Sequence, residues 1–282
     1  MNNDKFLTHF KYKDSFKYLH SIALPPEKVP VELHDFYEIY FFISGDIKFF
    51  IDGKAYEMNK NDLMIINNDE LHRATPFSKK PYERIVIHFN KEYLNGFCDD
   101  EYRLIDFITK RKVGSGNYIP GVDIHKSNIW NMIEKIEETI QQKPKLYELL
   151  IKTYFVQLLF EIKNLYYKIL ENEIEDKQYD ERITEIIEYI NNNLKEKITL
   201  ATIEDKFYIN KYYLCHLFKK TTGFTILEYV NHKRLTVSKQ MLLDGKPVMD
   251  TCYEAGFSDY SNFYKMFKRV TGMSPKKFAK EN

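Results

Sequence analysis

The sequence predicts an α+β protein: a β-rich domain over about residues 1–175, then a helical domain over about residues 180–282. Three observations lead to this prediction. A short basic segment near the C-terminus recurs 49 residues later. Short runs of aromatic and β-branched residues, separated by turn residues, fill the first 90 positions. The two parts also carry opposite net charge.

The repeat is the most informative of these features. FKKTTG at 218–223 returns as FKRVTG at 267–272, and Leu214 and Asn210 correspond to Phe263 and Asp259. An internal repeat indicates one supersecondary unit used twice. Each copy ends in a glycine, which is typical of the residue that closes a helix. We therefore expect two similar helical units.

The first copy has the pattern of a helix-turn-helix. Thr199 is a good N-cap, and the apolar residues that follow it are spaced as in a helix that ends near Phe207. Asn210 can cap a second helix only three residues later. Two helices joined by so short a turn are typical of this motif.

The second copy has the same order. Pro247 suits the start of a short helix, Gly256 suits the turn, and Ser258 or Asp259 can cap the next helix. Between the copies, apolar residues over 226–243 predict one long connecting helix, which Gly245 would end. The C-terminal domain is thus predicted to be all helical.

The outward faces of the two second helices carry the candidate DNA contacts. A pair of basic residues at a helix end is often no more than a solvated end that suits the helix dipole. Here the same basic face occurs twice at matched positions, which favours DNA binding. The candidates are Lys211, Tyr212, Cys215, His216, Lys219 and Lys220 in the first copy, and Tyr260, Ser261, Tyr264, Lys265, Lys268 and Arg269 in the second.

With these motifs, residues 180–278 resemble the DNA-binding domain of the AraC/XylS transcriptional regulators. The strongest matches are AGFSD at 255–259, FKR at 267–269 and GMSP at 272–275. The resemblance implies double-stranded DNA as a partner, contact with RNA polymerase, and activation of transcription. The sequence departs from the family pattern at Glu204 and Cys252, where a small residue is usual, and at Tyr208, where the turn usually has glycine. The arginine that often follows the final aromatic is absent after Phe278.

Charge supports a nucleic-acid partner for the C-terminal part. Residues 206–282 have 14 Lys and Arg against 6 Asp and Glu, a net charge of +8, whereas the rest of the chain has a net charge of −7. A basic module gains affinity by releasing counterions from phosphates, and its binding weakens with salt.

The rest of the composition is consistent with a cytoplasmic protein. There is no run of 18 apolar residues that would predict a membrane span, and the N-terminus has no basic-then-apolar signal. Three scattered cysteines (Cys98, Cys215 and Cys252) lack metal-site spacing and fit reduced thiols.

The pattern of the first 90 residues predicts a β-sandwich or barrel. Asp52 and Gly53 stand between two strand-like runs and give a strong hairpin signal. Further strands are predicted within 36–51, at 63–66 and at 84–89.

Within this region, residues 24–89 resemble the cupin-like sensor domain of AraC-type regulators, with His34, Glu38 and His72 at motif positions. The first histidine of a metal-binding cupin is replaced by Glu32, which leaves three ligands that could still hold a metal in an open site. Sensor cupins often keep such residues as polar pocket walls or surface remnants, so we expect no metal and no cofactor. Tyr40 shares strand parity with Glu38. An aromatic face with one carboxylate suits a small, sugar-like effector, although the same residues can simply be core. The candidate ligand-binding residues are His34, Glu38, Tyr40 and His72.

Two further segments complete the expected organisation. Apolar residues over 127–142 and 146–170 predict an antiparallel helix pair, interrupted at Pro144. In the family such a pair commonly forms the contact of a homodimer, and the charged run 171–181 would be the linker. Two alternatives remain for the whole chain: a metal-dependent cupin enzyme, and a DNA-binding factor that needs no effector. We expect a regulator and not an enzyme.

Overall fold

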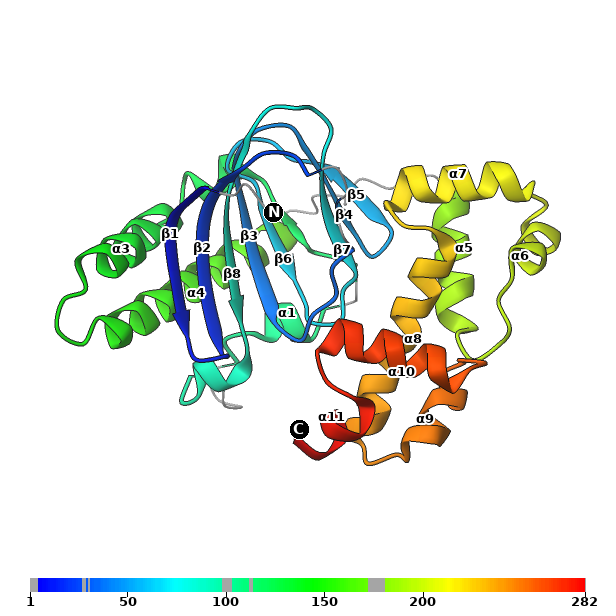
Figure 1. The fold of residues 1–282 in the computed structure, drawn as a ribbon. Helices are drawn as coiled ribbons and strands as arrows, with labels where there is room; N and C mark the ends of the chain where they lie inside the picture. Colours follow the sequence, from blue (N-terminus) through cyan, green and yellow to red (C-terminus); the bar gives the residue numbers. More distant parts are fainter. Residues whose placement is uncertain are drawn as a thin grey trace.

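The computed structural model describes residues 5–26, 29, 31–97, 103–111, 114–171 and 181–281. A β-rich part and a helical part lie side by side, in the order expected for an α+β chain (Figure 1). The expected linker at 171–181 falls almost entirely outside the described residues. Within the described ranges, no helix is both long and apolar enough to cross a membrane.

The N-terminal part contains two antiparallel sheets and not a closed barrel. The larger sheet has six strands in the order β1-β2-β8-β3-β6-β9, and the smaller one has the order β5-β4-β7. The strands are β1 (Lys5–Tyr12), β2 (Phe16–Ala23), β3 (Tyr37–Ser44), β4 (Ile47–Ile51), β5 (Lys54–Glu57), β6 (Leu63–Ile66), β7 (His72–Pro76), β8 (Tyr82–Phe89) and β9 (Tyr118–Ile119).

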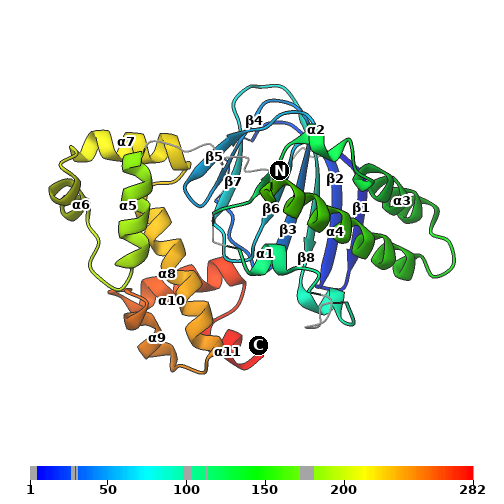
Figure 2. The ribbon, with the colours of Figure 1, turned by 180° about the vertical axis from the view of Figure 1, so that it is seen from behind.

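Each face of the larger sheet has its own apolar core. One core, which includes Tyr40, Phe49 and Met64, lies between the two sheets. The other lies under a helix pair, α3 (Ile129–Gln142) and α4 (Tyr147–Glu171), which covers the outer face of the sheet (Figures 1 and 2). Three short helices fill the connections: η1 (Lys91–Leu94), α1 (Asp106–Thr109) and α2 (Gly121–Ile124). The predicted helix pair is therefore confirmed.

The hairpin predicted at Asp52 and Gly53 is also confirmed. It joins β4 to β5, and both residues have positive φ, +43° and +91°, as a type I′ turn requires. Glycine is needed at position 53 for a second reason. A Cβ there would lie 2.1 Å from Cδ1 of Ile187, which belongs to the helical part.

The C-terminal part is all helical, as expected. α6 (Leu200–Phe207) and α7 (Lys211–Thr222) form one helix-turn-helix, and α9 (Val248–Glu254) and α10 (Tyr260–Thr271) form the other. The long α8 (Ile226–Leu243) joins them, while α5 (Glu181–Asn192) and α11 (Pro275–Glu281) flank the pair.

The helix caps explain why the repeat forms these units. The side chains of Thr199, Asn210 and Asp259 each accept a backbone N–H in the first turn of the helix that follows. Gly223 and Gly272 end the second helices with nearly equal φ values of +77° and +74°.

The turns of the two helix-turn-helix units differ, and the first unit differs at the positions where the sequence departs from the family pattern. Tyr208 takes a left-handed φ of +53°, and its side chain is 94% exposed. In the second unit Gly256 is required, because a Cβ would lie 2.1 Å from the carbonyl oxygen of Leu194. Glu204 also has a local role, since its Oε1 accepts the backbone N–H of Lys211 at 3.1 Å and helps to cap α7.

An apolar core joins the β-rich and helical parts. Leu33, Phe50, Ala55 and Leu71 from the first part pack with α5, α7 and α8. Arg73 on β7 donates a hydrogen bond to the carbonyl of Gly223 at 2.5 Å, and its guanidinium lies 5.3 Å from the ring centroid of Phe224. The helical part is thus docked by packing as well as by polar contacts.

A buried ion pair crosses the same boundary. Nζ of Lys233 on α8 lies 2.9 Å from Oδ1 of Asp52, and both side chains are nearly inaccessible. Burial raises the pKa of Asp52 to about 6, against the attraction of Lys233. At Lys233, burial lowers the pKa, but the charge of Asp52 outweighs burial and raises it above its usual value. At neutral pH both groups are therefore charged.

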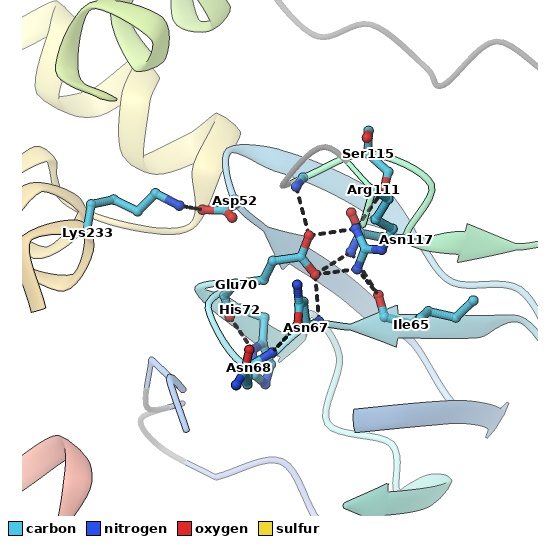
Figure 3. A network of polar contacts seen from close by, with 11 residues as sticks. Asp52, Ile65, Asn67, Asn68, Glu70, His72, Arg111, Ser115, Asn117 and Lys233 are labelled. Atoms are coloured by element: carbon cyan, nitrogen blue, oxygen red, sulfur yellow. Dashed lines mark hydrogen bonds and ion pairs between the residues drawn. The ribbon is translucent and has the colours of Figure 1, made fainter. Parts of the chain in front are cut away.

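A second buried ion pair holds the loop beneath this hairpin (Figure 3). Both guanidinium ends of Arg111 donate to the two carboxylate oxygens of Glu70, at 2.6 and 2.5 Å. Backbone N–H groups of Asn67 and Gly114 and the side-chain amide of Asn117 each add a hydrogen bond of 2.8 Å. Glu70 is thereby fully paired although it is almost completely buried.

We predict that Lys233→Met lowers the free energy of unfolding by about 3–5 kcal/mol, because it leaves the Asp52 carboxylate buried without its cation. The loss should shrink as the pH falls towards about 6, since removal of Lys233 raises the pKa of Asp52 further and the carboxyl takes up a proton in the folded variant. Urea unfolding at several pH values measures both effects.

The Asp52→Asn/Lys233→Met double variant is the control. It removes both charges and should recover much of the stability that the single variant loses. Equal losses in the single and double variants would contradict a net role for the ion pair.

We also predict that Glu70→Ala costs about 3–5 kcal/mol of stability, because it strands the buried Arg111 guanidinium. Lys11→Ala removes an exposed, solvent-screened ion pair with Asp14 and should leave stability nearly unchanged. Similar unfolding curves for these two variants would show that the buried network is not important for stability.

Candidate functional site

The two expected recognition helices pack against opposite halves of α8: α7 against the N-terminal half and α10 against the C-terminal half (Figures 1 and 2). Their apolar stripes, Leu214 and Phe218 in α7 and Phe263 and Phe267 in α10, are buried in the helical part. The opposite faces are therefore turned outward. Exposed there are Lys211, Tyr212, Cys215, His216, Lys219 and Lys220 on α7, and Ser261, Tyr264, Lys265, Lys268 and Arg269 on α10.

Two of the aromatic candidates differ in accessibility. Tyr212 is 77% exposed at the start of α7, where it can reach a neighbouring molecule. Tyr260 occupies the corresponding end of α10 but is half-buried against the rings of Phe263 and Tyr264. On α10, Lys265 is therefore more accessible to a neighbouring molecule than Tyr260 is.

The described cysteines have different surroundings. Cys215 is exposed on the outward face of α7, whereas Cys252 is buried under α10. Burial, together with the charge of Asp259, raises the pKa of the Cys252 thiol to about 11, so it stays protonated. Cys98 lies outside the described residues.

A cavity of about 940 Å³ opens between the β-rich and helical parts. Its walls include Glu32, His34 and Arg73 from the first part, and His232 and Arg269 from the second. Burial, and then the charge of Arg269, lower the pKa of His232 to about 4, so this imidazole is neutral. Arg269, expected only at phosphates, therefore also faces the sensor side of the molecule.

The predicted ligand residues of the β-rich part meet at the carboxylate of Glu38. Its Oε2 lies 2.7 Å from Nε2 of His88, 3.0 Å from Nε2 of His34 and 3.6 Å from Nε2 of His72. Glu38 itself is buried on β3. One acidic oxygen is thus surrounded by three imidazoles.

Two further residues belong to this group. Glu32, at the position of the first histidine of a metal-binding cupin, contributes a carboxylate oxygen, and the ligand atoms of Glu32, His34, Glu38 and His72 all lie within 4.8 Å of one another. His88 was not recognised, although it faces Glu38 across the β3–β8 register. The only sequence signal for His88 is that it stands at an inward-facing position of a predicted strand.

The charges of the group are strongly coupled. Burial alone would raise the pKa of Glu38, but the charge of His88 and hydrogen bonds from the histidines hold it well below its usual value. Burial lowers the pKa of His34, and the neighbouring histidines add to this effect despite Glu38. His72 behaves differently, because Glu38 and Glu32 outweigh burial and raise its pKa to about 9.

Tyr40 lies apart from the histidines, in the core between the sheets. Its ring is buried and packs edge-on against Phe49. Among the described residues its hydroxyl has no hydrogen-bond partner, and burial raises its pKa. The Tyr40 hydroxyl is therefore unsatisfied within a packed core, whereas the Glu38 carboxylate is surrounded by imidazoles.

Two matched helix-turn-helix units beside a sheet-rich domain with an inward polar group define the class: a DNA-binding regulator with a sensor domain. Comparison with known families agrees. Residues 20–159 match the AraC-like ligand binding domain, and residues 203–281 match a helix-turn-helix domain. The chain belongs to the AraC family of transcriptional regulators.

Relatives share this organisation along most of their length. The HTH-type transcriptional regulator YdeC of Bacillus subtilis is 26% identical over 263 residues, which is 90% of this chain and 87% of the relative. The lactose operon transcription activator of Staphylococcus xylosus is 21% identical, over 80% of this chain and 77% of its own. Among solved structures, ToxT of Vibrio cholerae aligns with 15% identity and a TM-score of 0.37, covering 95% of this chain and 98% of that one.

For the DNA-binding surface we predict contrasting effects of two lysines on α10. Lys265→Ala should relax the preference at one base pair and cost about 1–3 kcal/mol on the preferred site, because a lysine can donate to guanine O6 and N7. Lys268→Ala, at the C-terminal end of the helix, should weaken binding to all sequences alike and reduce the salt slope by about one.

Fluorescence anisotropy with the preferred site, single-base variants of it and unrelated DNA measures both effects. Lys11→Ala, on the outer strand β1, is the matched lysine control and should leave DNA affinity unchanged. Equal losses on every sequence for Lys265→Ala would rule out its role in reading bases.

Proposed function

We propose that this regulator activates transcription by reading two neighbouring major grooves with α7 and α10, under the control of an effector bound by its β-rich domain. The observation that supports two-groove reading best is the pair of outward basic helices that pack against opposite halves of one continuous helix, α8. Such helices suit successive major grooves on one side of a duplex.

The exposed residues divide by their chemistry. Tyr212, His216, Tyr260 and Lys265 lie in the N-terminal halves of the helices and are proposed to meet base edges. Lys219, Lys220, Lys268 and Arg269 lie in the last turns and are proposed to meet phosphates. The flanking residues Lys211, Cys215, Ser261 and Tyr264 would border the same grooves.

Control by an effector is supported by the way the two parts are joined. A shared apolar core and the Asp52–Lys233 ion pair tie α8 to the β-rich part. A ligand that binds one docked arrangement better than another will therefore change DNA affinity. A sugar-like effector stays a prediction, with Tyr40 as its proposed aromatic contact.

Further partners follow from the family and from the surface. The proposed homodimer would use the α3–α4 pair, because Leu149, Phe160 and Tyr167 are exposed apolar residues along α4. RNA polymerase is the expected partner in activation. We further propose that the chain acts in the cytoplasm and is not an enzyme, since the outward faces of α7 and α10 suit DNA and the polar group of the β-rich domain suits a ligand.

The first test is selection of bound fragments from a random DNA pool by the full-length protein at near-physiological salt, with Lys265→Ala in parallel. We expect a motif with two short blocks about one helical turn apart. The Lys265→Ala variant should lose information in one block only.

The selected site then serves as the probe for effectors. Recovery of a single short block would contradict two-groove reading. If the two-block motif is bound equally tightly with every candidate effector and without any, the protein is an effector-independent factor and the sensing part of the proposal fails.

A further inference from the structure

We infer that Glu32, His34, Glu38 and His72 form a binding site for a divalent transition-metal ion such as Zn²⁺, and that the ion controls how the DNA-binding domain is docked. This inference rests on the proposed function, because it names the chemistry of one effector. Its first part, metal binding, stands without DNA.

Two histidines form hydrogen bonds through Nδ1 that suit metal binding through Nε2. Nδ1 of His34 donates to the carbonyl of Phe36 at 3.1 Å, and Nδ1 of His72 donates to the carbonyl of Glu70 at 3.0 Å. Metal-ligating histidines typically donate their second N–H in this manner, which fixes the tautomer. The lone pair of each Nε2 is thus directed at Glu38.

This arrangement suits positive charge at its centre, carried either by a proton on an imidazole or by a metal ion. In their neutral forms His34 and His72 direct Nε2 lone pairs at a carboxylate oxygen, 3.0 and 3.6 Å away. In the described part of the chain, Nε2 of His72 has no hydrogen-bond partner, although the side chain is only 3% exposed. Either an added proton or a metal ion has to separate these groups.

The spacing fits one ion after small adjustments. The four ligand atoms lie within 4.8 Å of one another. Ligands bonded at about 2.1 Å in a tetrahedral site lie roughly 3.4 Å apart, so side-chain shifts on the order of 1 Å close the site. His88 would remain outside as a donor to the Glu38 carboxylate, an outer contact of the kind that orients metal ligands.

The donor set selects the class of metal. Two imidazoles with two carboxylates suit zinc and the neighbouring transition metals, whereas Mg²⁺ and Ca²⁺ prefer sites made only of oxygen. The interdomain cavity, lined by Glu32 and His34, supplies a route from solvent.

Two of the ligands lie on a segment that also holds the DNA-binding domain. Residues 31–35 have ligands at the even positions, Glu32 and His34. The odd positions face the helical part: Val31 and Leu33 pack in the shared core, and Asp35 forms an ion pair with Lys239 on α8. The alternation is that of an extended chain, whose successive side chains point to opposite sides.

The two faces of this segment are mechanically linked. An ion that draws Glu32 and His34 towards Glu38 and His72 fixes the backbone of residues 31–35, and with it Leu33 and Asp35. Because these two residues contact α8, which joins the recognition helices, the ion favours one docked arrangement.

The first experiment measures metal binding by the full-length protein after removal of metals with a chelator. Calorimetric titration with Zn²⁺ should give one equivalent, and Co²⁺ should give visible absorption bands from nitrogen and oxygen ligands. Mg²⁺ should not compete. Glu38→Gln and the more exposed Glu32→Gln should each weaken Zn²⁺ binding by at least about tenfold.

His20→Gln is the matched control, because His20 also lies between two glutamates, Glu83 and Glu137, in the same domain. It should bind Zn²⁺ like the unaltered protein. Absence of Zn²⁺ binding, or equal binding by the Glu32, Glu38 and His20 variants when all are folded, overturns the site.

The second experiment measures hydrogen exchange with and without Zn²⁺. Zn²⁺ should slow exchange in residues 31–35 and in α8. In the Leu33→Ala/Asp35→Asn variant, Zn²⁺ should still bind but should no longer protect α8. Bound Zn²⁺ with unchanged exchange in α8 of the unaltered protein overturns the coupling, whereas absence of a selected DNA motif counts only against the proposed function.

Discussion

The buried ion pair between Glu70 and Arg111 is the constraint on which both the sensor group and the domain contact depend. It fixes the segment of residues 70–72, of which Glu70 and His72 are drawn in Figure 3. The carbonyl of Glu70 accepts the Nδ1 proton of His72, so the pair also fixes the ring that faces Glu38. The side chain of Leu71 enters the core shared with the helical part, and its carbonyl accepts the backbone N–H of Asp52. A charge pair buried this deeply is stable only when its remaining hydrogen bonds are satisfied, as they are here.

The contacts between the β-rich domain and α8 explain how sensing and DNA binding can be coupled in this chain. The hairpin residue Asp52 and the extended residue Asp35 both pair with lysines of α8, Lys233 and Lys239. A helix that joins two recognition helices is thus held at two points by the acidic domain. Docking uses cations on α8, while the lysines on the outward faces of α7 and α10 remain exposed. Apart from Arg269, which is exposed on α10 and also lines the cavity between the two parts, the basic residues of the two surfaces are therefore different.

Local chemistry is the reason that much of the helical part could be predicted. Thr199, Asn210 and Asp259 cap helices through hydrogen bonds that span only two or three residues, so their effect is visible in the sequence. The hairpin at Asp52 and Gly53 is equally local. The strands β1 and β2 were not predicted, because their inward residues alternate irregularly with polar ones. In addition, β2 pairs with β8, which is far away in sequence, and β1 pairs only with β2.

The sequence by itself determined the fold class, the repeated helix-turn-helix units and the outward basic faces, because periodicity, caps and charge act within a few residues. Only the tertiary structure decided which polar residues meet. His88 reaches Glu38 across a strand pair, and Glu32 joins His72 through a single backbone bridge between distant segments. Which face of an extended segment contacts which domain is likewise set by packing over long sequence separations. That packing leaves no periodic signal in residues 31–35 from which the contacts could have been inferred.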